Sequence, residues 1–275
     1  MYLLQIEWDP IKFIDLGFFK LHFYSLMWII AFVIGFYTMK PIFKKEGESK
    51  DALDALFIYS VLGIMLGARL GHVIFYEPEL FKEDFFSIFL PFSFKDGIRF
   101  TGFQGLASHG AAIAMIISMY LYRKKHLLHR SWLWILDRVV IPVALGAVFV
   151  RIGNFINSEI VGFKTDSPLG VIFVQNGENF ARHPAQLYEA FFYIFVFIGL
   201  LFFYWRTNKS KQEGFLFGLF LVLLWTIRFF VEFVKKAQVD GRDDYVWFMN
   251  TGQVLSVPLI LIGLYFMFFY KKKAE

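Results

Sequence analysis

The chain has 275 residues, of which 57% are hydrophobic and only 19% are charged. A soluble domain is near half apolar and a quarter charged, so this composition excludes an ordinary soluble protein and indicates a membrane protein. The net charge is +5, but the basic residues lie in short clusters between apolar runs, which argues against a nucleic-acid-binding face. Because the chain has no cysteine, disulfides, thiolate metal sites and a cysteine nucleophile are excluded.

Seven apolar segments approach the roughly 20 residues that a transmembrane helix needs. We therefore predict an all-α polytopic membrane protein with about seven transmembrane helices, at 22–40, 53–76, 106–122, 132–152, 186–205, 214–234 and 251–270. No linker, repeat or low-complexity tract is visible in the sequence, so we predict one integral-membrane domain over residues 1–275. The N-terminal segment lacks the basic region and cleavage site of a removable signal peptide, and we expect it to be retained.

The connections between these segments alternate in charge. Half of the 28 basic residues lie around 40–50, 123–130 and 206–211 and in the tail 271–273. By the positive-inside rule, we expect the N-terminus outside and the C-terminus in the cytoplasm. The longer opposite connections, about 77–105, 153–185 and 235–250, carry turn signals such as Asp240-Gly241 and predict a small extracytoplasmic cap. Within it, VIFVQNGENF predicts a short hairpin with an Asn176-Gly177 turn.

The second predicted span has glycines at a spacing of four, Gly63, Gly67 and Gly71. That spacing predicts a small-residue face for close helix approach in lipid. Arg69 and His72 lie at i and i+3 on the same helix. We interpret them mainly as packing residues whose side chains bond polar groups of neighbouring helices. Direct contact with the substrate is the alternative.

The third predicted span opens with GLASHGAAIAM, which places His109 at its outer end. The imidazole could simply hydrogen-bond a neighbouring helix. We favour a functional role, because the site faces the same side as Arg151 and histidine accepts a proton readily near neutral pH.

The fourth predicted span ends in RIGNFINSEIVG, which begins at Arg151. A guanidinium at the end of a membrane span costs free energy unless a negative charge offsets it. The planar array of N–H donors of an arginine suits a lipid phosphate. The alternative is an ion pair between Arg151 and Glu159 that stabilises a re-entrant turn. In that case Asn154 and Asn157 would hydrogen-bond exposed backbone groups. Gly153 and Asn154 predict that the helix ends here.

In the sixth predicted span, Arg228 and Glu232 share a helix face at i and i+4. One interpretation is that Arg228 and Glu232 form an ion pair that neutralises both charges within the bilayer. However, the predicted topology places Arg228 in the outer half of the bilayer, level with Arg151 and His109, and three such residues from three helices indicate a site.

The segment RHPAQLYEA opens the fifth predicted span and supplies polar groups near the outer interface. We interpret His183, Gln186 and Tyr188 as mainly structural, with Glu189 the foremost candidate for a further role. For Tyr24, in the first span, a structural role and a functional role are both possible interpretations.

Together these motifs resemble those of the bacterial prolipoprotein diacylglyceryl transferases. RIGNFINSEIVG resembles their GxRxGNFxNxExxG signature, and GARLGHVIFY, SHG, RHPAQLYEA and RFFVEF match in order over nearly the full length. The resemblance implies a seven-helix bacterial inner-membrane enzyme whose site opens to the periplasmic side. It implies transfer of the diacylglyceryl group of phosphatidylglycerol to the thiol of a lipobox cysteine in exported prolipoproteins, with release of glycerol phosphate.

Carried onto this sequence, the resemblance implies catalytic roles for His109, Arg151 and Arg228. The residues expected to contact the lipid are Arg151, Tyr24, Asn154, Asn157, Glu159, Gly162 and Glu232. The chain departs from the family where Leu224 replaces a common tyrosine, where Ala111 replaces a glycine, and where Lys235 and Lys236 stand in for an arginine.

This chemistry agrees with the residues present. Two arginines would stabilise the departing phosphate, and a thiol with a pKa of about 8.5 needs a base, for which His109 is the candidate. We expect no metal, cofactor or nucleic acid; the expected partners are phosphatidylglycerol, prolipoprotein signal peptides and the membrane. The alternatives are a transporter or flippase for an anionic lipid or solute, for which no inverted repeat is seen, and another phospholipid headgroup enzyme.

Overall fold

The computed structural model describes residues 6–17, 20–95, 97–100, 105, 107–236 and 249–270, apart from the side chains of Ser108 and His109. The chain forms two compact units, one from Met1–Met39 and Leu136–Glu275 and the other from Lys40–Ile135. The boundaries fall within helices α1 (Phe23–Glu46) and α5 (Trp132–Ile156). The single domain expected from the sequence stays a prediction.

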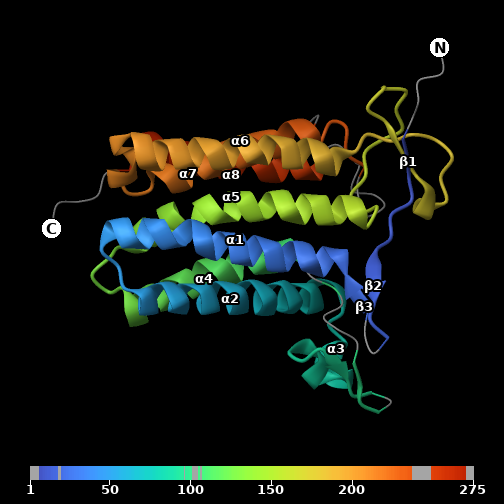
Figure 1. The fold of residues 1–275 in the computed structure, drawn as a ribbon, viewed down its shortest axis with the longest axis horizontal. Coiled ribbons are helices and arrows are strands. Elements are labelled where there is room, and N and C mark those ends of the chain that lie inside the picture. The colour runs from blue at the N-terminus through green and yellow to red at the C-terminus, as the bar shows by residue number, and fades with distance from the viewer. Residues whose placement is uncertain are drawn as a thin grey trace. The chain divides into compact units, whose positions relative to one another are not determined.

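Each predicted span corresponds to a helix in the described ranges (Figure 1). Besides α1 and α5 these are α2 (Lys50–Tyr76), α4 (Ser108–His126), α6 (Ala185–Arg206), α7 (Phe215–Val231) and α8 (Thr251–Phe268). Within the described residues, α1, α2, α5, α6 and α8 are long and apolar enough to cross a membrane, which fits a multi-pass membrane protein. Helix α7 has only 17 residues, and α4 has four basic residues in its last turn. The count of seven spans therefore stays a prediction.

In the unit Lys40–Ile135, helices α2 and α4 lie side by side, and glycines set how closely they approach (Figure 1). A Cβ at Gly67 would lie 2.6 Å from the carbonyl oxygen of Gly110, and one at Gly71 would lie 2.7 Å from Gly110 Cα. A Cβ at Gly63 would lie 2.8 Å from Ser118 Cβ. The small-residue packing face predicted from the spacing of these glycines is confirmed.

The connection after α2 folds into short elements: α3 (Leu80–Glu83), η1 (Phe85–Ile88) and an antiparallel pair of strands, β4 (Phe92–Ser93) and β5 (Arg99–Phe100). Asp84 joins them, because its Oδ2 accepts hydrogen bonds from Ser93 Oγ at 2.8 Å and from the Phe94 N–H at 2.9 Å. Burial acts to raise the pKa of Asp84, but these hydrogen bonds outweigh it, and the pKa lies below its usual range.

Arg69 and His72 point toward the same connection. Arg69 Nη2 donates to the Ser87 carbonyl at 3.4 Å, and Arg69 Nη1 lies 3.7 Å from Glu77 Oε2. His72 Nε2 lies 3.5 Å from the same carboxylate oxygen. These contacts support the interpretation that both side chains hold neighbouring segments together.

In the other unit, α7 packs between α6 and α8, and both of its ends are fixed by polar contacts. Asp137 of α5 is fully buried and accepts hydrogen bonds from the N–H groups of Gly214 at 2.7 Å and Phe217 at 2.8 Å. It thereby satisfies N–H groups that the first turn of α7 leaves unpaired. Gly218 and Gly263 then bring α7 and α8 together, since a Cβ at Gly218 would lie 2.5 Å from the Gly263 carbonyl oxygen.

The N-terminal segment adds short strands to this unit. Strand β1 (Ile6–Trp8) pairs in parallel with β6 (Val171–Phe173), and β2 (Phe13–Asp15) pairs antiparallel with β3 (Lys20–His22). The indole of Trp8 donates to the Phe155 carbonyl at 3.0 Å, at a small apolar core. This core ties the N-terminal segment to the end of α5.

The hairpin predicted at residues 171–180 is wrong in its two-residue turn, although the chain does return to form an antiparallel bridge between Val171 and Arg182. The strand that pairs with β6 along its length is β1, and residues Val174–Asn176 form the 3-10 helix η2. Gly177 has the positive φ, 71°, that the Asn-Gly signal indicated, but it ends that helix rather than closing a hairpin. The pairing partner comes from a distant part of the chain, which a local turn signal does not reveal.

Candidate active site

The end of α5 lies next to a strained turn. The helix continues to Ile156, four residues beyond its predicted end, because the Asn157 N–H still bonds the Gly153 carbonyl at 3.0 Å. Ser158 and Ile160 then have positive φ values of 58° and 61°. A β-branched residue rarely adopts this conformation, and such strain clusters at functional sites.

The strained turn is held from outside. Gln186 of α6 is fully buried and donates its side-chain N–H to the Glu159 carbonyl at 2.5 Å. The Asn176 side chain donates to the Ser158 carbonyl at 3.0 Å. These two bonds fix the direction in which the Glu159 side chain leaves the backbone.

Arg151, in the last turns of α5, forms an ion pair with Glu189 of α6 through its Nε. Its Nη1 donates to Asn154 Oδ1 at 3.2 Å, and the guanidinium also interacts electrostatically with the Tyr193 side chain. Only 12% of the Arg151 side chain and 1% of the Glu189 side chain are exposed. The carboxylate that pairs with Arg151 is therefore that of Glu189 and not that of Glu159.

Glu159 instead accepts hydrogen bonds from the two signature asparagines. The side-chain N–H groups of Asn154 and Asn157 lie 2.9 Å and 3.3 Å from its Oε1. Tyr24 of α1 interacts electrostatically with Glu159 and Arg151 and packs over Gly153, where a Cβ would lie 2.8 Å from its ring. Four residues expected from the sequence to contact the lipid thus lie in one network with Arg151.

Gly162 has a backbone role in this arrangement. Its N–H donates to the His183 carbonyl at 2.9 Å, and the next N–H, of Phe163, donates to the Val234 carbonyl at 2.8 Å. A Cβ at Gly162 would lie 2.5 Å from the Val234 carbonyl oxygen, so only glycine fits between these segments. Contact between Gly162 and a lipid stays a prediction.

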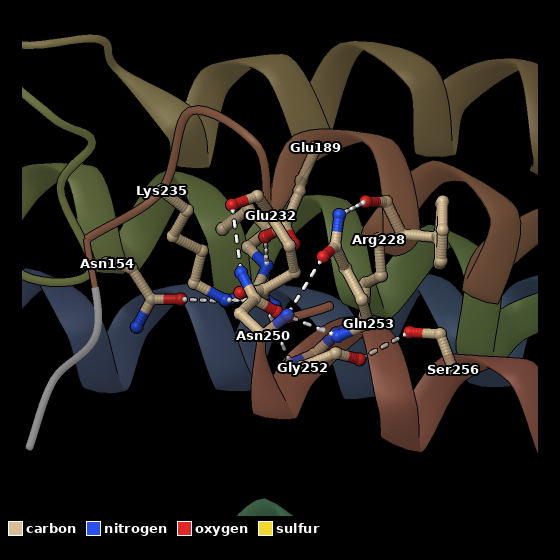
Figure 2. Close-up of polar contacts among 11 residues, drawn as sticks. Asn154, Glu189, Arg228, Glu232, Lys235, Asn250, Gly252, Gln253 and Ser256 are labelled. Carbon is tan, nitrogen blue, oxygen red and sulfur yellow. Dashed lines mark hydrogen bonds and ion pairs between the residues drawn. The ribbon is translucent and has the colours of Figure 1, made fainter. Parts of the chain in front are cut away.

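Arg228 lies near the end of α7, with its guanidinium 5.2 Å from the centre of the Trp225 ring. Its Nη2 lies 3.7 Å from Glu232 Oε1, and its buried Nε has no hydrogen-bond partner among the described residues. Glu232 Oε1 also accepts a hydrogen bond from Lys235 Nζ at 2.7 Å (Figure 2). Glu232 thus faces two cations, and it holds Lys235 more closely than Arg228.

The contacts around Arg151 and those around Arg228 meet at Lys235 and Tyr193. Tyr193 interacts electrostatically with Glu189, Arg151 and Arg228. Burial lowers the pKa of Lys235; the charges of Glu189 and Glu232 oppose this shift, and those of Arg228 and Arg151 add to it. Figure 2 shows Glu189, Arg228, Glu232 and Lys235 together with Asn154. We call Arg151, Arg228, Lys235, Glu159, Glu189 and Glu232 the polar cluster.

The polar cluster contains as many carboxylates as cations. Its own Glu189 and Glu232 therefore offset much of the cost of burying the guanidiniums, which the sequence suggested a lipid phosphate would do. His109 lies in the first turn of α4, in the other unit, and its side chain falls outside the described residues. Its role as a base stays a prediction.

Comparison with known proteins identifies the family. The model of the family described as prolipoprotein diacylglyceryl transferase matches residues 11–269, which is most of the chain. The chain belongs to this family. Similar proteins named phosphatidylglycerol–prolipoprotein diacylglyceryl transferase occur in Bacteroides fragilis, 38% identical over 274 residues and covering 98% of this chain and 97% of the relative. Those of Tolumonas auensis (39% over 265 residues, 96% of each chain) and Chloroherpeton thalassium (35% over 272 residues, 98% of this chain and 96% of the relative) are also similar.

In this member of the family, the polar cluster has neighbours that the sequence did not single out. Tyr193 lies four residues after Glu189 on the same face of α6, a spacing that could have indicated it. Asn250 and Gln253 form a capping box at the start of α8, which the pattern Asn-x-x-Gln also allows one to recognise. Neither pattern reveals that it would adjoin Arg228.

Proposed function

We propose that this protein transfers the diacylglyceryl group of phosphatidylglycerol to the thiol of a lipobox cysteine in prolipoproteins and releases glycerol phosphate. Membership of the family and the names of the relatives support the activity. The observation in the molecule that carries the proposal is the presence of Arg151 and Arg228, from two different helices, in one partly buried polar cluster. Buried cations of this kind suit an anionic phosphodiester.

In the proposed reaction, a C–S bond replaces a C–O bond at one carbon of the glyceryl group. The thiolate sulfur attacks the glyceryl carbon that carries the phosphate, a C–S bond forms, and the C–O bond to the phosphate breaks. The electron pair of the broken bond leaves with glycerol phosphate, whose charge rises in the transition state. Positioned cations stabilise such developing charge. The thiol proton passes to a base, and His109 is the proposed acceptor.

The two arginines differ in how many donors they have for the phosphate. Arg151 is held by Glu189, Asn154 and Tyr193. Among the described residues, Arg228 lies over the Trp225 ring and approaches Glu232 only to 3.7 Å, and its Nε has no hydrogen-bond partner there. An unpaired buried N–H costs free energy, which a phosphate oxygen would recover. Arg228 is therefore the principal phosphate ligand, and Arg151 organises the signature residues and adds charge.

The proposed setting is the bacterial cytoplasmic membrane, with α4 and α7 completing seven spans. The N-terminus lies outside and the C-terminus in the cytoplasm, and the segments 77–105 and 153–185 form an extracytoplasmic cap. The alternation of basic connections supports this orientation. The active site then faces the extracytoplasmic side, where exported prolipoproteins arrive.

A transfer assay tests the proposal. The purified full-length chain is given phosphatidylglycerol radiolabelled in an acyl chain and a peptide with a lipobox cysteine. We expect the label to become covalently attached to the peptide and glycerol phosphate to appear in equal amount, with no transfer to a peptide carrying serine in place of the cysteine. Lipid movement across vesicles without covalent transfer, or headgroup release without the thiol peptide, would contradict it.

A further inference from the structure

The first turn of α8 contacts the end of α7 at the Glu232 carboxylate. A Cβ at Gly252 would lie 2.6 Å from Glu232 Oε2 and 2.8 Å from Oε1, closer than real Cβ atoms approach other atoms. Gly252 does not have a positive φ. A Cβ at this position would therefore displace the Glu232 carboxylate, which is the end of a flexible side chain.

The same turn also binds the backbone of α7. In the capping box, the Gln253 N–H donates to Asn250 Oδ1 at 2.9 Å, and the Asn250 N–H donates to Gln253 Oε1 at 3.0 Å. Gln253, only 1% exposed, also donates from its side-chain amide nitrogen to the Phe229 carbonyl at 3.3 Å. Asn250 donates to the Glu232 carbonyl at 3.1 Å (Figure 2). Two carbonyls that the end of α7 leaves without helical partners are thus satisfied by α8.

These contacts place Glu232 between two elements. Its backbone is held by Asn250, and its carboxylate lies on Gly252. On its other side the carboxylate holds Lys235 at 2.7 Å and faces Arg228 at 3.7 Å. A carboxylate at a helix N-terminus is also favoured by the helix dipole. Any movement of α8 relative to α7 would therefore be passed to both cations.

We propose that Gly252 and Gln253 are positioning residues of this enzyme, which act through Glu232 to set the Arg228 guanidinium and the Lys235 ammonium. The inference rests on the proposed function. The turn of α8 touches no reacting atom. It determines where the Glu232 carboxylate lies, and hence where the two cations meet the phosphate of the lipid.

The test is Gly252→Ala in the full-length protein, with Gly199→Ala as the matched control, because a Cβ at Gly199 meets nothing within 4 Å. An error of an ångström in the position of a catalytic group costs about 100-fold. For Gly252→Ala we therefore expect kcat/KM for phosphatidylglycerol to fall by about that factor, with KM raised and kcat lowered. A loss of folded enzyme would lower only the apparent kcat.

Shortening the carboxylate side chain separates the proposed role from simple packing. In a Glu232→Asp background, the side chain withdraws from the new Cβ, and adding Gly252→Ala should cost no more than about threefold, because the two changes share one contact. If Gly252→Ala does not accumulate in membranes, Gln253→Glu, which keeps the acceptor but loses the donor to Phe229, should raise KM in the same way.

Three results would overturn the inference while leaving the function intact. In the first, the wild type is active and Gly252→Ala has the same kcat/KM as Gly199→Ala. In the second, the KM of Gly252→Ala equals that of the wild type. In the third, Gly252→Ala lowers kcat/KM by the same factor with and without the Glu232→Asp change. A wild-type protein that fails to label the lipobox peptide would instead contradict the proposed function itself.

Discussion

At the scale of single residues, the ion pair between Arg151 and Glu189 is the contact on which the candidate site depends most. Both side chains are almost fully buried, and each is the other's main counter-charge. Removing one partner of a buried pair leaves an uncompensated charge, which costs about 3–5 kcal/mol. A simple alanine substitution at Arg151 therefore changes stability as well as chemistry.

We expect Arg151→Ala to abolish diacylglyceryl transfer and to destabilise the protein by about 3–5 kcal/mol, because the Glu189 carboxylate is left without its cation. Adding Glu189→Gln should restore much of the stability but not the transfer. Thermal unfolding in detergent and the transfer assay measure the two effects. Transfer restored in the double variant would show that Arg151 is needed only for folding.

The sequence revealed the polar residues of the site but not all of their partners. Arg151, Asn154 and Asn157 were singled out from a single segment, and all three prove to join one network with Glu159. The partner of Arg151 lies 38 positions later on another helix, and spacing within one helix says nothing about that choice. By charge alone, either Glu159 or Glu189 could be the counter-ion of Arg151.

At the scale of elements, the positions of the helices followed from hydrophobic length, whereas some of their ends did not. Apolar runs of the required length have few alternatives to a helix in lipid, because every backbone group must be paired. The end of α5 was misplaced because Asn154, expected to terminate the helix, uses its side chain on Arg151 and Glu159 instead. The strained turn after Ile156 depends on Gln186 and Asn176, which are distant in the sequence.

The packing of α2 on α4 yields a prediction for Gly67. A Cβ there would press against the Gly110 carbonyl oxygen, a backbone atom that cannot move aside easily. We expect Gly67→Ala to lower stability by about 1–3 kcal/mol, as overpacking does. Gly199→Ala in α6, which has open space, should be neutral or slightly stabilising, since alanine favours helix. Equal unfolding temperatures for the two variants would contradict the close contact.

Asp84 gives a pH dependence to the connection after α2. Its pKa is lowered in the folded protein, so the stabilisation is present above the usual value of 3.8 and is lost as the pH falls through the lowered value. We expect the Phe94 amide to be protected from hydrogen exchange, relative to its intrinsic rate, at neutral pH and unprotected in strong acid. Asp84→Ala should remove that protection at neutral pH, whereas the control Glu79→Ala at an exposed carboxylate should not.

At the scale of the whole molecule, the orientation in the membrane is open to direct measurement because the chain has no cysteine. Asp166 and Lys209 are both accessible and lie in connections predicted to face opposite sides. In intact spheroplasts, we expect a membrane-impermeant maleimide to label Asp166→Cys but not Lys209→Cys, and to label both after lysis. Labelling of Lys209→Cys before lysis would reverse the predicted topology.

The equal number of cations and carboxylates in the polar cluster has a consequence for turnover. The formal charges of the polar cluster cancel, so we expect it to exert little long-range pull on anions and, on the proposed function, to select phosphatidylglycerol after its arrival by diffusion within the leaflet. In the proposed reaction, the departing glycerol phosphate carries more negative charge than the phosphodiester did, and we expect Glu189 and Glu232 to compete with it for the Arg151 and Arg228 guanidiniums. On this proposal, the carboxylates that pair with the guanidiniums in the resting enzyme also help to expel its product.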